Sequence, residues 1–159
     1  MPFFGKAKPF HIQPLVRDFA EDCATLHAAA FPHSWAAPEF EHLIGAETTL
    51  GDAAVESRAR KLFGFILSRK ALDEAEILTV TVDATLRGQG IAGKILDVHL
   101  PRLARHGVTT VFLDVAETNV PALRLYARFG FDTVGRRQGY YRAADGPTVT
   151  ALTMRRRLS

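Results

Sequence analysis

The chain has 159 residues, of which 47% are hydrophobic and 23% are charged, and its formal net charge is +3. This length and composition are typical of one globular domain spanning residues 1–159, and they favour neither a disordered nor a membrane protein. The longest apolar runs are much shorter than the roughly 20 residues that cross a bilayer. The first residues carry no apolar run followed by a small-residue cleavage site, so we expect a cytoplasmic protein.

The cysteine, histidine and arginine residues limit the kinds of functional site that the chain can contain. Cys23 is the only cysteine, which excludes an intrachain disulfide and a thiolate cluster for zinc. The six histidines have no spacing typical of metal ligands, so no metal is predicted. Three consecutive arginines at 155–157 end a predicted strand and are weak grounds for a nucleic-acid partner, which we do not expect.

The first third of the chain predicts a short strand followed by two helices. Residues 10–15 are strand-like, and Asp18 with Glu21 three residues later has the spacing of a capping box that starts a helix. Residues 31–35 break this helix. Pro38 then suits the first turn of a second helix.

The middle of the chain predicts three strands and a helix. The runs 48–55, 62–68 and 77–82 are rich in apolar and β-branched residues, which favours an antiparallel meander. A helical pattern then extends from Ile91 towards Gly107, a natural helix stop. Pro101 removes one helical hydrogen bond, so we expect a kink or a shortened last turn.

The remaining elements complete a mixed sheet. A strand at 109–115 follows the helix, so it should lie parallel to the strand at 77–82 in a right-handed crossover. Asn119 can cap one more helix, and strands near 131–141 and 148–154 end the chain.

A glycine-containing turn lies between the strand at 77–82 and the helix that follows it. The residues read Arg87-Gly88-Gln89-Gly90-Ile91-Ala92. The N-terminus of a helix presents free backbone N–H groups and positive charge, which suits a pyrophosphate group, and glycines let the backbone approach the anion. The spacing matches neither a Walker loop nor a dinucleotide fingerprint, so the turn alone is a weak signal.

A second segment strengthens this interpretation. Residues 111–119 read VFLDVAETN, residues 122–126 read ALRLY and residues 129–131 read FGF. With the glycine turn, this pattern resembles the GNAT acetyltransferases. The resemblance implies an α+β (α/β) acyl-CoA N-acyltransferase fold, with a mixed sheet of about seven strands flanked by four helices. It also implies acetyl-CoA as co-substrate, held by Val80, Thr81, Val82, Arg87, Gly88, Gln89, Gly90, Ile91, Ala92, Gly93 and Asn119.

Further local patterns are Ala30-Phe31-Pro32 with Trp35, the run 119–126, and the run 136–141 ahead of Asp145-Gly146. In these the chain resembles the bacterial ribosomal-protein-alanine N-acetyltransferases of the RimI type. This implies that Tyr126 protonates the departing thiolate. Asp114 stands where the family has a glutamate as general base; because aspartate is one methylene shorter, a bridging water becomes plausible. The resemblance implies a peptide groove whose walls include Phe31, Trp35, Tyr140 and Tyr141.

The acceptor amine is open at this stage. A protein α-amino group has a pKa of about 7.7–8.0 and a lysine side chain about 10.4, so the α-amine needs less help from a base. This favours a protein N-terminus, as in a small ribosomal-subunit protein. The alternatives are an enzyme acting on a small-molecule amine or a lysine, and a non-catalytic acetyl-CoA-binding module. The alternative for the aromatic residues of the predicted groove is packing at the ends of elements. Tyr126 could instead be a core residue, and Asp114 could be a solvated strand end.

Overall fold

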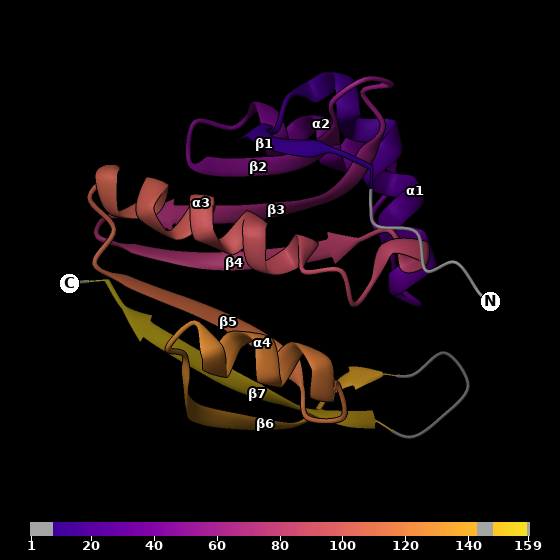
Figure 1. The fold of residues 1–159 in the computed structure, drawn as a ribbon. Helices are drawn as coiled ribbons and strands as arrows, with labels where there is room; N and C mark the ends of the chain where they lie inside the picture. The colour runs from indigo at the N-terminus through magenta and orange to yellow at the C-terminus, as the bar shows by residue number, and fades with distance from the viewer. Residues whose placement is uncertain (1–7, 143–147, 159) are drawn as a thin grey trace.

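The computed structural model describes residues 8–142 and 148–158, and it does not describe the side chains of residues 140–142. Within these residues seven strands form one sheet in the order β1-β2-β3-β4-β5-β7-β6 (Figure 1). The strands are β1 (Phe10–Pro14), β2 (Thr49–Glu56), β3 (Leu62–Ala71), β4 (Glu74–Val82), β5 (Thr110–Ala116), β6 (Asp132–Arg142) and β7 (Thr148–Arg157). The α-helices are α1 (Ala20–Ala30), α2 (Ala37–Gly45), α3 (Ile91–Arg105) and α4 (Val120–Arg128).

The topology confirms the predicted meander and crossover. Strands β1 to β4 pair antiparallel in sequence order, and β4 pairs parallel with β5 after the α3 crossover. Strand β7 lies between β5 and β6 and runs antiparallel to both. The sheet is therefore mixed, with its one parallel pair, among the strands described, at its centre.

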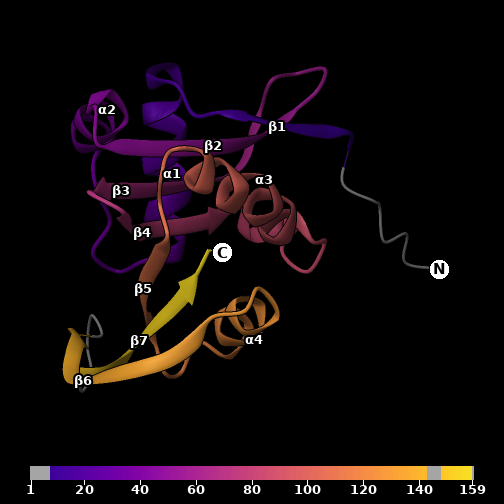
Figure 2. The same ribbon diagram turned by 90° about the vertical axis from the view of Figure 1, so that its left-hand side faces the viewer.

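The helices cover the sheet from both sides (Figure 2). Helices α3 and α4 lie over one face, above a core cluster that includes Ile95, Leu100 and Leu113. Helices α1 and α2 cover the other face of β2 and β3, above a second cluster that includes Phe40 and Phe65. None of the helices in the described ranges is long and apolar enough to span a membrane.

Helix α1 does not begin with the predicted capping box. Asp18 lies in a 3-10 turn, Arg17–Phe19, and α1 starts at Ala20 with Phe19 at the N-cap and no side-chain cap hydrogen bond. Phe19 is buried in the cluster below α1. Burying a phenylalanine contributes about 2–3 kcal/mol, more than the roughly 1 kcal/mol of a cap, so packing sets this helix start.

Pro101 does not shorten the last turn of α3, which was one of the two effects predicted for this residue. The helix runs through it to Arg105. Both Pro101 and Asp97, whose carbonyl loses its helical partner, are exposed, so water can satisfy that carbonyl. Leu100 and Leu103 on either side are buried, and this packing outweighs the one missing hydrogen bond.

Candidate active site

The two central strands diverge near the middle of the sheet. Parallel pairing of β4 with β5 extends from Glu74 opposite Thr110 to Ile77 opposite Leu113. At the same level the pairing of β4 with β3 shifts by one residue, which leaves Leu78 as a bulge. A bulge bends a strand and increases its twist, so the second half of β4 turns away from β5, as Figure 1 shows.

The second half of β4 keeps one open edge. The N–H of Asp83 donates to the carbonyl of Phe63 in β3 over 2.8 Å. By the alternation of an extended strand, Thr81 also faces β3, whereas the backbone groups of Val80 and Val82 face the side where β5 has departed. An extended ligand with amide groups can pair with this edge. Of the three predicted residues, Val80 and Val82 are therefore the ones placed to contact it.

The turn from β4 into α3 has the backbone of an anion site. Gly88 and Gly90 have φ angles of +80° and +79°, and no atom lies within 4 Å of the position that a Cβ would take at either. Glycine adopts this left-handed conformation without strain, and the open space leaves room for a bound group. The first helical hydrogen bond joins the N–H of Lys94 to the carbonyl of Gly90 over 3.1 Å.

Three N–H groups therefore remain without a partner inside the helix, those of Ile91, Ala92 and Gly93. They lie at the positive end of the α3 dipole, and Arg87 precedes the two glycines in the chain. The donors and the free space together fit the pyrophosphate of the predicted coenzyme.

Asp83 fixes the start of this turn. Its Oδ1 accepts hydrogen bonds from the N–H of Thr85 at 2.9 Å and from the Thr85 hydroxyl at 2.8 Å. These bonds, with the nearby charges of Lys61 and Arg87, lower the pKa of Asp83. The carboxylate is thus a charged cap that stays ionised at neutral pH.

Asn119 is the N-cap of α4, as predicted. Its Oδ1 accepts from the N–H of Ala122 over 3.3 Å. This bond leaves both N–H groups of the side-chain amide available to donate to a coenzyme.

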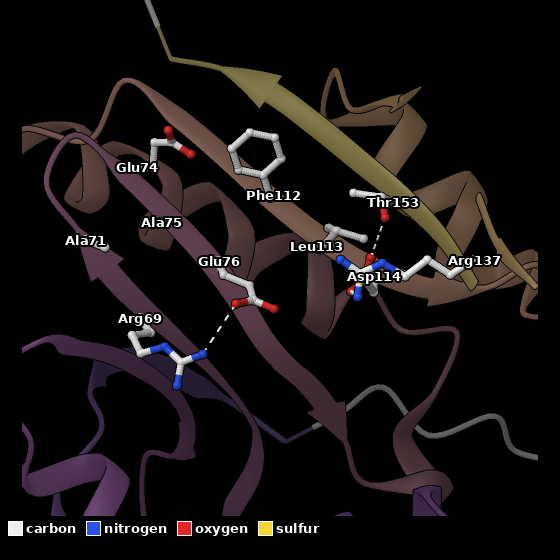
Figure 3. Close-up of a pocket in the computed structure, with 10 residues that line it drawn as sticks. All are labelled: Arg69, Ala71, Glu74, Ala75, Glu76, Phe112, Leu113, Asp114, Arg137 and Thr153. Carbon is white, nitrogen blue, oxygen red and sulfur yellow. Dashed lines mark hydrogen bonds and ion pairs between the residues drawn. The ribbon is translucent and has the colours of Figure 1, made fainter. Parts of the chain in front are cut away.

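Asp114 lies on the sheet face opposite α3 and α4, next to a cavity of about 330 Å³ (Figure 3). Its neighbours Leu113 and Val115 point to the buried side, so alternation turns Asp114 outward. Its Oδ1 accepts a 2.6 Å hydrogen bond from the Thr153 hydroxyl of β7, and its Oδ2 lies 3.8 Å from Nη1 of Arg137 of β6. Two strands therefore orient the carboxylate.

The far end of the same cavity carries a second charged pair. Nη2 of Arg69 lies 3.5 Å from Oε2 of Glu76, and the Phe112 ring lines the same cavity (Figure 3). Sequence reasoning did not identify Thr153, Glu76 or Phe112 as part of a site. Glu76 and Phe112 are opposite each other in the β4–β5 pairing. The predicted parallel crossover could therefore have indicated that these two residues lie close together.

Tyr126 is 8% exposed and lies on the other side of the sheet from Asp114. Its ring packs edge-on against Phe131, with centroids 5.8 Å apart. It belongs to the core cluster that contains Val115 of β5, and Val80 of β4 packs against that cluster. The two predicted catalytic residues therefore do not form one cluster; they lie on opposite faces of the sheet, by the diverging strands.

The connection between α1 and α2 is an aromatic stack centred on His27. The His27 ring lies 4.5 Å from the Phe31 ring and 4.7 Å from the Trp35 ring, and its Nδ1 accepts the N–H of Trp35 over 3.2 Å. Burial lowers the pKa of His27, although the charge of Glu39 acts against this. Sequence reasoning placed His27 on the helix face but missed that it supports both predicted groove residues.

Two further predicted groove residues, Tyr140 and Tyr141, belong to β6, but their side chains lie outside the described part of the structure. Cys23 is fully buried, and burial raises the pKa of its thiol to about 12. The thiol therefore stays protonated at neutral pH and is not a nucleophile.

The sequence model of the acetyltransferase (GNAT) family matches residues 17–131, and the chain belongs to this family. It is 35% identical over 163 residues to the N-alpha-acetyltransferase RimI of Mycobacterium tuberculosis, covering 94% of this chain and 93% of that protein. It is 32% identical over 93 residues to the [ribosomal protein bS18]-alanine N-acetyltransferase of Haemophilus ducreyi, covering 58% of this chain. That match spans only 64% of the relative's length.

The fold agrees with these sequence matches. The crystal structure of the ribosomal-protein-S18-alanine N-acetyltransferase from Escherichia coli superposes with a TM-score of 0.86 at 25% identity, covering 95% of both chains. The predictions of the GNAT family and of its mixed seven-stranded sheet are confirmed.

Proposed function

We propose that the chain is an N-acetyltransferase that moves the acetyl group of acetyl-CoA directly to the α-amino group of a protein N-terminus. The open edge of β4, which leads straight into the glycine turn and the unpaired N–H groups of α3, carries this proposal. Together, this strand edge and this turn form a continuous surface that can bind a chain with amide groups and the pyrophosphate attached to it. The names of the relatives support a protein N-terminus as the acceptor. The more specific acceptor that they suggest is the N-terminal alanine of a ribosomal protein.

Acetyl-CoA supplies the acetyl group as a thioester. The N–H groups at the start of α3 bind its pyrophosphate, and Arg87 adds positive charge there. The backbone of Val80 and Val82 pairs with the pantetheine amides, and a β4 N–H stabilises the oxyanion as the carbonyl is attacked. This pairing fixes the thioester between the diverging strands.

The acceptor reaches the thioester from the cavity beside Asp114. A neutral amine attacks the carbonyl carbon, the carbon–sulfur bond breaks, and the amine proton passes through a water to the Asp114 carboxylate. The departing sulfur takes its proton from the Tyr126 hydroxyl on the opposite side of the sheet. The hydrogen bond from Thr153 keeps Asp114 turned towards the cavity.

The remainder of the acceptor lies along the aromatic connection. Phe31 and Trp35, held against His27, form one wall of this peptide groove. A protein N-terminus suits this arrangement because its α-amine is partly neutral at pH 7, so a short carboxylate acting through water is sufficient.

Replacing the candidate base tests this proposal. We expect Asp114→Asn to lower kcat about tenfold at pH 7, and the deficit to shrink above pH 8. The physical reason is that an α-amine with a pKa near 8 deprotonates unaided at higher pH and then needs no base. The measurement is the pH profile of thiol release from acetyl-CoA with a peptide that has a free N-terminal alanine.

Glu117→Gln is the matched control. Glu117 is a nearby carboxylate whose Oε2 pairs with Nη2 of Arg136 at 2.9 Å on the surface. Its removal should leave kcat within about twofold, as is usual for exposed ion pairs. A kcat for Asp114→Asn equal to wild type at every pH would show that the carboxylate is only a structural strand residue.

A further inference from the structure

A buried chain of hydrogen bonds joins α3 to β2 and β3. Nε2 of His99 lies 2.7 Å from Oγ of Ser68 in β3, and its Nδ1 lies 2.7 Å from Oδ2 of Asp52 in β2. Nη1 of Arg102, one turn further along α3, donates to Oδ1 of Asp52 and to the carbonyl of Gly51, each over 2.8 Å. We call Asp52, His99, Ser68 and Arg102 the α3 anchor.

The α3 anchor contains the residue types of a serine nucleophile triad but cannot act as one. Ser68 and His99 are 0% exposed and Asp52 is 1% exposed, so no substrate reaches the hydroxyl. The Asp52 carboxylate can only accept hydrogen bonds, which places a proton on Nδ1 of His99. Every buried polar side-chain atom in the described residues has a hydrogen-bond partner, so this group is fully satisfied.

The geometry of the anchor fixes the height and rotation of α3. Asp52 is opposite Ile66 in the β2–β3 pairing and Ser68 is opposite Leu50, so Asp52 and Ser68 are diagonal neighbours that the His99 ring bridges. Apolar contacts are not directional and tolerate sliding. A slide or rotation of α3 would lengthen or misalign both bonds of His99, and losing them would leave buried polar groups without partners.

Helix α3 is also the element whose N-terminus forms the coenzyme turn. His99 lies eight residues after Ile91, or about 12 Å along a rigid helix, so its position determines where the N–H groups of the first turn point. We propose that Asp52, His99, Ser68 and Arg102 are positioning residues for coenzyme binding. They hold the start of α3 at the height where its N–H groups meet the pyrophosphate. This inference rests on the proposed function, which assigns that turn to acetyl-CoA.

The test is Ser68→Ala, which removes one hydrogen bond of His99 with little change in volume. We expect the Kd for acetyl-CoA, measured by calorimetry, to rise about threefold to tenfold, the range seen when a residue couples to a remote site. The KM for the acceptor peptide should stay within twofold. Replacing a residue with only a structural role would change the Kd for acetyl-CoA and the KM for the peptide together.

Ile66→Val is the matched control, because Ile66 lies on the same strand, fully buried in the cluster beneath α3, and makes no side-chain hydrogen bond. Its Kd for acetyl-CoA should stay within twofold of wild type although its unfolding temperature falls. Arg102→Gln, on the partly exposed rim of the anchor, provides a second variant if Ser68→Ala fails to fold, and its Kd should rise about twofold to fivefold.

Two results overturn the inference alone. The first is an unchanged Kd for acetyl-CoA in Ser68→Ala, or in Arg102→Gln if Ser68→Ala does not fold. The second is a loss of affinity in Ile66→Val equal to that in the anchor variant. The wild-type protein keeps its affinity for acetyl-CoA in both of these cases. Failure of the wild-type protein to bind acetyl-CoA would instead overturn the proposed function and this inference together.

Discussion

Tyr126→Phe is expected to lower kcat at least about 100-fold while the Kd for acetyl-CoA stays unchanged. The departing thiolate needs a proton, and a positioned general acid typically contributes 10²–10⁴-fold in rate. The substitution keeps the ring, and therefore its edge-on packing on Phe131, and removes only the hydroxyl. Steady-state thiol release at saturating substrate measures kcat, and equilibrium coenzyme binding measures the Kd.

Phe131→Leu distinguishes catalysis from packing in this experiment. Phe131 is 3% exposed and contacts the same ring, so its truncation loosens the core around Tyr126 but leaves the hydroxyl in place. We expect a lower unfolding temperature and a kcat within about threefold of wild type. If Tyr126→Phe instead retains wild-type kcat, Tyr126 is a core residue and another group protonates the sulfur.

The second large effect is expected at the glycine turn, where Gly90→Ala should weaken acetyl-CoA binding at least about tenfold. Gly90 has a φ of +79°, a conformation that costs an alanine about 1–2 kcal/mol. The turn can escape this strain by moving, which displaces the N–H groups at the start of α3. If it does not move, the new methyl group projects into the space proposed for the pyrophosphate. Tenfold corresponds to about 1.4 kcal/mol.

Gly107→Ala gives an internal control for backbone strain. Gly107 follows the other end of α3, has a φ of +85° and likewise has no atom within 4 Å of a Cβ position. The two variants should therefore lose similar stability in thermal unfolding. Only Gly90→Ala should lose coenzyme affinity, and an equal loss in both would show that the turn has no specific part in binding.

Most of the fold could be predicted from local sequence patterns. Apolar runs and turn residues gave the meander, and a helix between two strands implied the parallel β4–β5 pair. The place of β7 between β5 and β6 was not predicted, because antiparallel strand order depends on long-range packing and leaves no local pattern. The start of α1 differs from prediction for a related reason: core packing outweighs capping, and it also outweighs the hydrogen bond that Pro101 removes from α3.

The candidate site was predictable where it follows one continuous segment. The glycine turn and the Asn119 cap are local and lie as predicted. The partners of Asp114 are not local: Thr153 is 39 residues away and meets it only through the β5–β7 register. His99 shows the same limit, because its partners Ser68 and Asp52 are 31 and 47 residues away, and the sequence shows only a histidine in a helix.

Thiol release from acetyl-CoA with two peptides tests the central claim most directly. One peptide has a free N-terminal alanine and no lysine, and the other has a blocked N-terminus and one internal lysine. Transfer to an α-amine predicts release with the first peptide only. Release with the second peptide alone, or with neither peptide although acetyl-CoA binds, would contradict the assignment of a protein N-terminus as the acceptor.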